Sequence, residues 1–298
     1  MSADESCCAA IDYIYDAFVT RLKPELRACA RDLTHRLGLS EEPGRCWSEA
    51  LDDPRLELPL LLFGDLRRPI SEDVCIAALR AHVFAFIASL IHERIDRHEL
   101  DADGELCGVL LVLEHERDLI VTSLCEMGER PRLDCHLAQR EARDALARER
   151  RVFEGLVGAR MDDFVASSVG KASPLFPAML ACGAASKLDV LELGHIHEII
   201  VGLSLGIAAR DEVRDWFERA QFGRSWAASM VEEGRERHEV FVSLVNLAVD
   251  SLVRAAAAAH ALDAVRVASW ALAQAEGLQR LLGRRELGRG NQLARAMR

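Results

Sequence analysis

The stretch that decides the fold is KLDVLELGHIHEIIVGLSLGIAARDEVRDWFER, residues 187–219. Apolar residues recur every three or four positions along most of it, which predicts a long buried α-helix. Its end becomes charged and carries Asp211, Glu212 and Asp215. Residues 71–98 follow the same plan, an apolar helix that ends in HERIDR. Two buried helices with acidic ends predict a helical bundle with carboxylates at its mouth.

The remaining residues also show helical periodicity, and convincing period-2 alternation is absent. A break is expected at Gly170, and Ser71 is expected to cap the helix that follows it. No linker is long or polar enough to divide the chain, so residues 1–298 are expected to form one all-α domain. Helices are expected at 8–38, 41–51, 57–64, 71–98, 104–127, 137–168, 173–183, 187–219, 223–232, 235–259 and 261–283, with a short basic tail after them.

Charge and composition narrow the classes of partner. The net charge of −11 argues against nucleic acid, because its phosphates need a basic surface. A small anionic substrate stays open, since bound divalent cations reverse the local sign of a site. The nine cysteines form no CxxC pair, and an odd number without a secretion signal favours reduced thiols in a cytoplasmic protein. Residues 74–92 are the most apolar, but Arg80 and His82 interrupt them, so a core helix and no transmembrane segment are expected.

Three clusters could support chemistry. Asp211 and Asp215 are four residues apart and share a helix face, with Glu212 beside them. Magnesium prefers one or two carboxylates together with substrate phosphates. The alternative is a solvated face on which Arg210 and Arg214 pair with the acids.

The second cluster is His92, Glu93 and Asp96, in which both acids share a face. Arg94 and Arg97 could pair with these acids and leave no metal site. The third feature is Lys171, one of three lysines in the chain. It is expected just before a helix start, where it could bind a diphosphate or be an ordinary surface lysine.

The order of these segments resembles the trans-isoprenyl diphosphate synthase family. SLIHERID at 89–96 is similar to the first aspartate-rich motif, and GKASPLF at 170–176 is similar to the family's lysine turn. GLSLGIAARDEVRD at 202–215 resembles the second aspartate-rich motif, and FGR at 222–224 stands where the family has FGK. The match covers roughly residues 57–233.

The resemblance implies a helical bundle around a central apolar cavity. It also implies Mg²⁺ held by Glu93, Asp96, Asp211 and Asp215, with Glu212 as a further catalytic acid. The substrate would be an allylic prenyl diphosphate, and the residues expected to bind its diphosphate are Lys171, Arg210 and Arg224. A homodimer is left open.

Two departures separate the candidate activities. His92 and Glu93 replace aspartates of the first motif. The family's basic, glycine-rich segment for isopentenyl diphosphate should fall near 53–61, which reads DPRLELPLL with Arg55 as its one basic residue. Loss of that second site favours a terpene synthase, which ionises one preformed prenyl diphosphate. The alternatives are an elongating prenyltransferase and a non-catalytic partner subunit.

Overall fold

The computed structural model describes residues 3–51, 53–66, 70–126, 135–218 and 225–296, and the side chains of these except 3–8, 215–218 and 284–296. Every regular element in these ranges is a helix and none is a strand, which confirms the all-α prediction. The helices are α1 (Ala3–Arg21), α2 (Pro24–Arg31), α3 (Leu33–Arg36), α4 (Trp47–Ala50), α5 (Pro54–Phe63), α6 (Glu72–Asp96), α7 (Gly104–Glu126), α8 (Cys135–Phe153), α9 (Met161–Ala172), η1 (Ser173–Leu175), α10 (Phe176–Ala185), α11 (Val190–Glu218), α12 (Trp226–Glu232), α13 (Arg237–Ala261) and α14 (Val265–Ala296).

Several predicted boundaries were wrong, for local reasons. The helix expected at 8–38 is three helices, because Pro24 forces Lys23 into an extended conformation with ψ 144°. The helix expected at 137–168 divides into α8 and α9 near Gly155, whose φ is +68°. The basic tail is also helical, since α14 continues to Ala296. Ser71 occupies the N-cap of α6 but its side chain makes no capping hydrogen bond.

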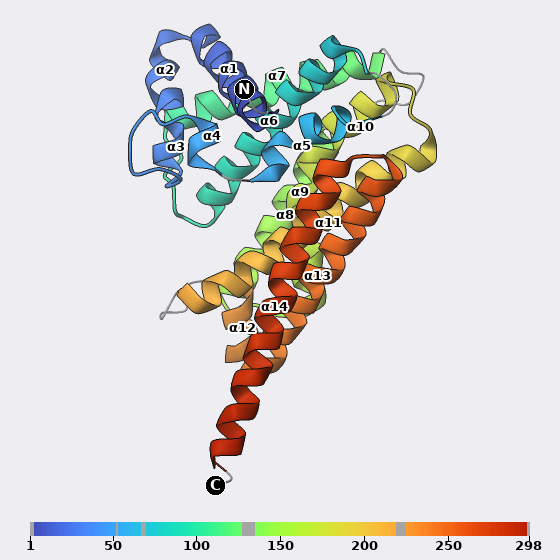
Figure 1. The fold of residues 1–298 in the computed structure, drawn as a ribbon. Helices are drawn as coiled ribbons and strands as arrows, with labels where there is room; N and C mark the ends of the chain where they lie inside the picture. The colour runs from blue at the N-terminus through green and yellow to red at the C-terminus, as the bar shows by residue number, and fades with distance from the viewer. Residues whose placement is uncertain (1–2, 52, 67–69, 127–134, 219–224, 297–298) are drawn as a thin grey trace.

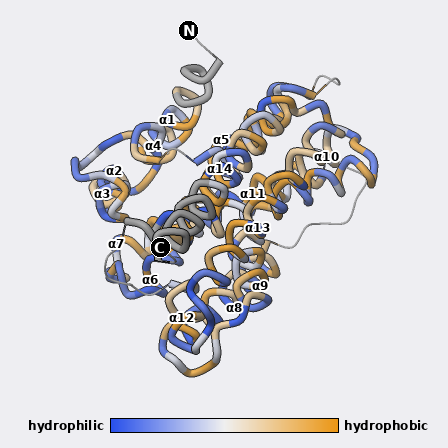
Figure 2. The backbone as a smooth tube through the Cα atoms, turned by 60° about the horizontal axis from the view of Figure 1, so that its bottom comes forward, coloured by the Kyte–Doolittle hydropathy of each residue, from blue (hydrophilic) through white to orange (hydrophobic). Residues whose placement is uncertain are grey.

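The long helices form an elongated bundle, with α1 to α4 gathered beside α6 and α7 at one end (Figure 1). Hydrophobic stretches run along α11 and α13, which pack extensively on each other (Figure 2). This contact depends on missing side chains, because a Cβ on Gly202 would lie 2.6 Å from the Ser251 carbonyl oxygen. A Cβ on Gly206 would lie 2.7 Å from Leu252. The centre of the bundle is therefore a close helix pair.

Helices α6 and α11 pack mainly on other helices and not on each other. The main contacts of α6 are with α7, α5 and α10, and those of α11 are with α13, α9 and α10. Both contact α5 and α10.

Three helical segments are long and apolar enough to cross a membrane by length and composition: Glu72–Asp96, Val190–Arg214 and Arg237–Ala261. The helix that contains residues 74–92 is therefore long and apolar enough to cross a membrane, although Arg80 and His82 interrupt it. More than half of each apolar window is buried among the other helices. Burial against protein gives these segments a place in a core, and the absence of a transmembrane segment stays a prediction.

Candidate functional site

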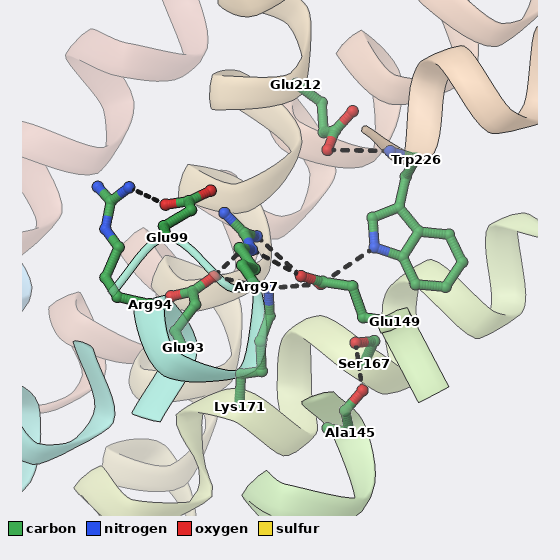
Figure 3. A network of polar contacts seen from close by, with 10 residues as sticks. All are labelled: Glu93, Arg94, Arg97, Glu99, Ala145, Glu149, Ser167, Lys171, Glu212 and Trp226. Atoms are coloured by element: carbon green, nitrogen blue, oxygen red, sulfur yellow. Dashed lines mark hydrogen bonds and ion pairs between the residues drawn. The ribbon is translucent and has the colours of Figure 1, made fainter. Parts of the chain in front are cut away.

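The acidic end of α6 meets two cations and a second, buried acid. Lys171 Nζ lies 3.2 Å from Glu93 Oε1 and 2.7 Å from Glu149 Oε2. Arg97 Nη2 lies 2.8 Å from both Glu93 Oε1 and Glu149 Oε1. Figure 3 shows these four side chains converging from α6, its C-cap, α8 and α9. They form one alternating network, in which each cation contacts both acids.

Close packing of α8 and α9 brings Lys171 to this network. A Cβ on Gly170 would lie 2.7 Å from the Cβ of Ala145, so the glycine lets α9 approach α8. Ser167 Oγ donates a 3.1 Å hydrogen bond to the Ala145 carbonyl on the same side. The break predicted at Gly170 was wrong, since α9 continues through Lys171 to Ala172. Lys171 therefore lies in the last turn of α9, two residues before η1 begins at Ser173.

Electrostatics keep all four groups charged. Burial alone would raise the pKa of Glu93, but the charges of Lys171 and Arg97 lower it to about 2. Burial alone would also raise the pKa of Glu149, but the same two cations outweigh it, so this pKa is lowered too. Burial lowers the pKa of Lys171, and the two acids more than offset this and raise it. The network is thus a set of ion pairs at neutral pH.

The other residues of the first cluster have partners within the protein too. Asp96 Oδ1 lies 3.1 Å from Arg150 Nη1 on α8. His92 Nε2 lies 2.9 Å from Glu114 Oε1 on α7, so this histidine points away from Glu149 toward a neighbouring helix. Arg94 pairs with Glu99 and not with Glu93.

In the second cluster, Asp211 is partly exposed and has arginine partners. Its side chain is 37% exposed, and its Oδ1 lies 3.0 Å from Arg210 Nη2 and 3.8 Å from Arg214 Nη2. Arg210 also donates a 3.1 Å hydrogen bond from Nη1 to Gln274 Oε1 of α14. Arg210 is thereby fixed beside Asp211 and partly neutralises it.

Glu212 has a structural partner that the sequence did not reveal. Its carboxylate accepts hydrogen bonds from the backbone N–H groups of Trp226, at 3.3 Å, and Ala227, at 3.0 Å. The N-cap residue Ser225 accepts another from Ala228 N at 3.0 Å. Together they satisfy the free N–H groups at the start of α12. The expected residues Arg224 and the side chain of Asp215 lie outside the described part of the structure.

Arg55, at the start of α5, joins the two clusters. Asp53 holds it through a pair of contacts, 3.0 Å to Nε and 2.5 Å to Nη2, and its guanidinium lies 5.7 Å from the centre of the Phe86 ring. Burial alone would lower the pKa of Arg55, but its pairing with Asp53 opposes this, and the pKa is raised. Asp211 and Glu93 both add to the rise. Helix α5, which carries Arg55, also packs against both α6 and α11. The ends of α6 and α11 are therefore taken together as one candidate site.

The described carboxylates do not form a ready ligand set for a metal ion. Glu93 and Glu149 are held by cations, Asp96 by Arg150, and Glu212 by backbone N–H groups. Within the described ranges no three acidic, histidine or cysteine side chains are placed to hold one ion. A pocket of about 670 Å³ lies elsewhere, between α2, α3 and α7, and is lined in part by Cys29, Arg36 and Glu105. The central apolar cavity and the magnesium site both stay predictions.

Sequence reasoning missed Glu149, which is 2% exposed. Its neighbours Arg148 and Arg150 make the segment look like a solvated surface. A signal was present, because Glu149 falls on the helical stripe of Ala145 and Val152, which are also buried. An acid on an apolar stripe needs a buried partner, and here the partners come from α6 and α9.

Comparisons with known proteins agree on the architecture. No protein-family model matches the chain, and no curated protein does. Among solved structures, a geranyltranstransferase from Methanosarcina mazei matches with a TM-score of 0.58 and 12% identity, over 92% of this chain and 97% of that one. A polyprenyl synthetase from Streptomyces coelicolor A3(2) matches with a TM-score of 0.56 and 14% identity, over 92% and 89%. The chain therefore has the all-α fold of the trans-isoprenyl diphosphate synthases.

Proposed function

We propose that this protein binds an allylic prenyl diphosphate at the shared end of α6 and α11 and promotes loss of its diphosphate. One observation carries the proposal: each acidic helix end has a cation beside an acid, Lys171 of α9 beside Glu93 and Arg210 of α11 beside Asp211. A third cation, Arg55, lies on α5, which packs against both helices, and it interacts electrostatically with both acids. Fixed cations of this kind stabilise negative charge as it develops on a leaving group. The fold, shared with two proteins named for prenyl transfer, supports the same substrate class.

In the proposed reaction the described side chains bind and orient the diphosphate. Lys171 supplies a point charge and Arg55 a planar guanidinium suited to phosphate oxygens. Each already has an acidic partner, so the diphosphate must share these cations with Glu93 and Asp53. Positive charge added with the substrate would ease that competition. Magnesium stays part of the proposal on this ground, with Asp211 as the acid least enclosed by partners.

A single diphosphate site favours ionisation or cyclisation over chain elongation. Arg55 is the one basic residue at 53–61, and both carboxylate oxygens of Asp53 bind the edge of its guanidinium formed by Nε and Nη2. An elongating enzyme needs a second diphosphate site for isopentenyl diphosphate. Prenyl transfer to a second substrate is nevertheless a full alternative, because the two solved neighbours are a geranyltranstransferase and a polyprenyl synthetase.

A non-catalytic role is the third candidate. It is supported by the ion pairs and hydrogen bonds that hold Glu93, Glu149 and Glu212 within the protein. A protein that kept the fold but lost metal-dependent chemistry could retain acids in this way. In that case the bundle would serve as a partner subunit.

The test is incubation with labelled farnesyl or geranylgeranyl diphosphate and Mg²⁺, with and without isopentenyl diphosphate. A hydrocarbon or alcohol formed without isopentenyl diphosphate supports the cyclase form, and a longer diphosphate supports elongation. Lys171→Gln should abolish turnover, whereas Lys23→Gln, at an exposed lysine of the α2 N-cap, should not. Absence of both turnover and substrate binding in the folded wild-type protein would refute the proposal. Binding without turnover would favour the partner role.

A further inference from the structure

Glu149 lies on α8, outside every segment that suggested function. It is 2% exposed and has four close contacts: Lys171 at 2.7 Å, Arg97 Nη2 at 2.8 Å and Nε at 3.1 Å, and Trp226 Nε1 at 3.2 Å. A buried carboxylate is costly unless its oxygens are fully paired. Glu149 meets this condition by drawing three other elements onto α8 (Figure 3).

The two acids of the network differ in how easily they can be replaced. The Glu93 side chain is 26% exposed, and we call this exposed side of the network its rim. The Glu149 side chain is 2% exposed and lies on the buried side. An incoming anion can take the place of Glu93, because water and the anion can reach both groups there. An anion that displaced Glu149 from the two cations would leave the Glu149 carboxylate charged and buried without a partner. Lys171 and Arg97 thus have one exchangeable and one permanent counter-ion.

We propose that Glu149 is a positioning residue: it holds Lys171 and Arg97 at the rim for the substrate's diphosphate and couples occupancy of that site to α12 through Trp226. The proposal rests on the proposed function and deepens it. It assigns Arg97 to the same anion subsite as Lys171. It also assigns Glu93 as the counter-ion that the diphosphate displaces.

Trp226 makes the coupling observable. The indole is 2% exposed, and its rings lie 6.0 Å from Phe153 and 5.9 Å from Phe164 in edge-on contacts. Its N–H donates to the carboxylate that holds both cations. An anion bound to Lys171 and Arg97 adds negative charge near the indole of Trp226 and so changes the electric field that acts on it. Its fluorescence should therefore report the occupied site.

The experiment uses inorganic pyrophosphate with Mg²⁺ as the probe, on the full chain. Pyrophosphate should change the fluorescence of the wild type, and Trp226→Phe should bind it by calorimetry with most of that change lost. Glu149→Gln should weaken pyrophosphate binding about tenfold or more, the size expected for losing a charged hydrogen-bond partner. Glu149→Asp should recover part of the affinity, and Glu141→Gln, at an exposed acid of the same helix, should match the wild type.

A second measurement needs no ligand. The chain has three lysines, so acylation of each can be followed by peptide mass spectrometry. In the wild type, Lys171 should be protected relative to Lys23 and Lys187, and Glu149→Gln should expose it. If Lys171 is equally protected in the wild type and in Glu149→Gln, the assignment of Glu149 is overturned. If Glu149→Gln does not fold, an unprotected Lys171 in the wild type would overturn it. A wild type that protects Lys171 but binds no pyrophosphate would instead refute the proposed diphosphate site.

Discussion

Acidification from pH 7 to pH 5 should destabilise the protein through His82. This histidine is fully buried in α6, and its Nε2–H donates a 2.6 Å hydrogen bond to the backbone carbonyl of Arg55. Burial lowers the pKa of His82 from 6.5 to about 4, against a smaller opposite effect of that hydrogen bond. The imidazole therefore stays neutral in the folded protein and becomes charged in the unfolded chain.

The sign and size follow from these two values. Between pH 6.5 and pH 4 the unfolded state binds the proton and the folded state does not, so the free energy of unfolding falls as pH falls through that window. The loss is about 2 kcal/mol at pH 5 and about 3 kcal/mol at pH 4. Because His82 fixes the backbone of Arg55, this loosening acts directly behind the candidate site.

Urea unfolding of wild type and His82→Gln from pH 7 to pH 4.5 would measure this term. Glutamine can donate to the same carbonyl but cannot titrate, so the stability gap between the two proteins should narrow by about 2 kcal/mol at pH 5. His136→Gln is the matched control, since that side chain is 90% exposed, and it should follow the wild-type profile. Parallel pH profiles for wild type and His82→Gln would refute the reasoning.

Two further predictions concern packing and metal binding. Gly202→Ala should destabilise the protein by about 1–3 kcal/mol, because its Cβ would meet the backbone of α13. Gly194→Ala, with nothing within 4 Å on the same helix, should be neutral or stabilise by up to about 1 kcal/mol, and equal effects in urea unfolding would contradict the close-contact argument. In magnesium titrations with diphosphate present, Asp211→Asn should raise the magnesium requirement more than Glu93→Gln or Asp96→Asn. The Asp211 side chain is the most exposed of the three, 37% against 26% and 23%, so its carboxylate is the most accessible to an added cation. Glu93→Gln as damaging as Asp211→Asn would reverse the ranking of the two clusters.

The all-α fold class could be predicted from the sequence alone, and it is confirmed. The acidic clusters at the ends of two helices were also visible in the sequence. Both long helices could be predicted because periodic burial is a local property of a helix, visible in the residues that repeat on one face. Boundaries near Lys23 and Gly170 could not be placed, because a proline between short helices and a glycine within one give similar local signals.

Tertiary structure alone decided what each acid contacts. Nothing near Glu212 in the sequence marks it as the acceptor for the first N–H groups of α12, which begins 14 residues later at Trp226. Nor does the segment around Glu149 indicate that Lys171 and Arg97 will bind it. The physical reason is the range of the interactions. Helix formation is set by neighbours a few residues apart, whereas an ion pair depends on distances of a few ångströms between side chains that only packing brings together.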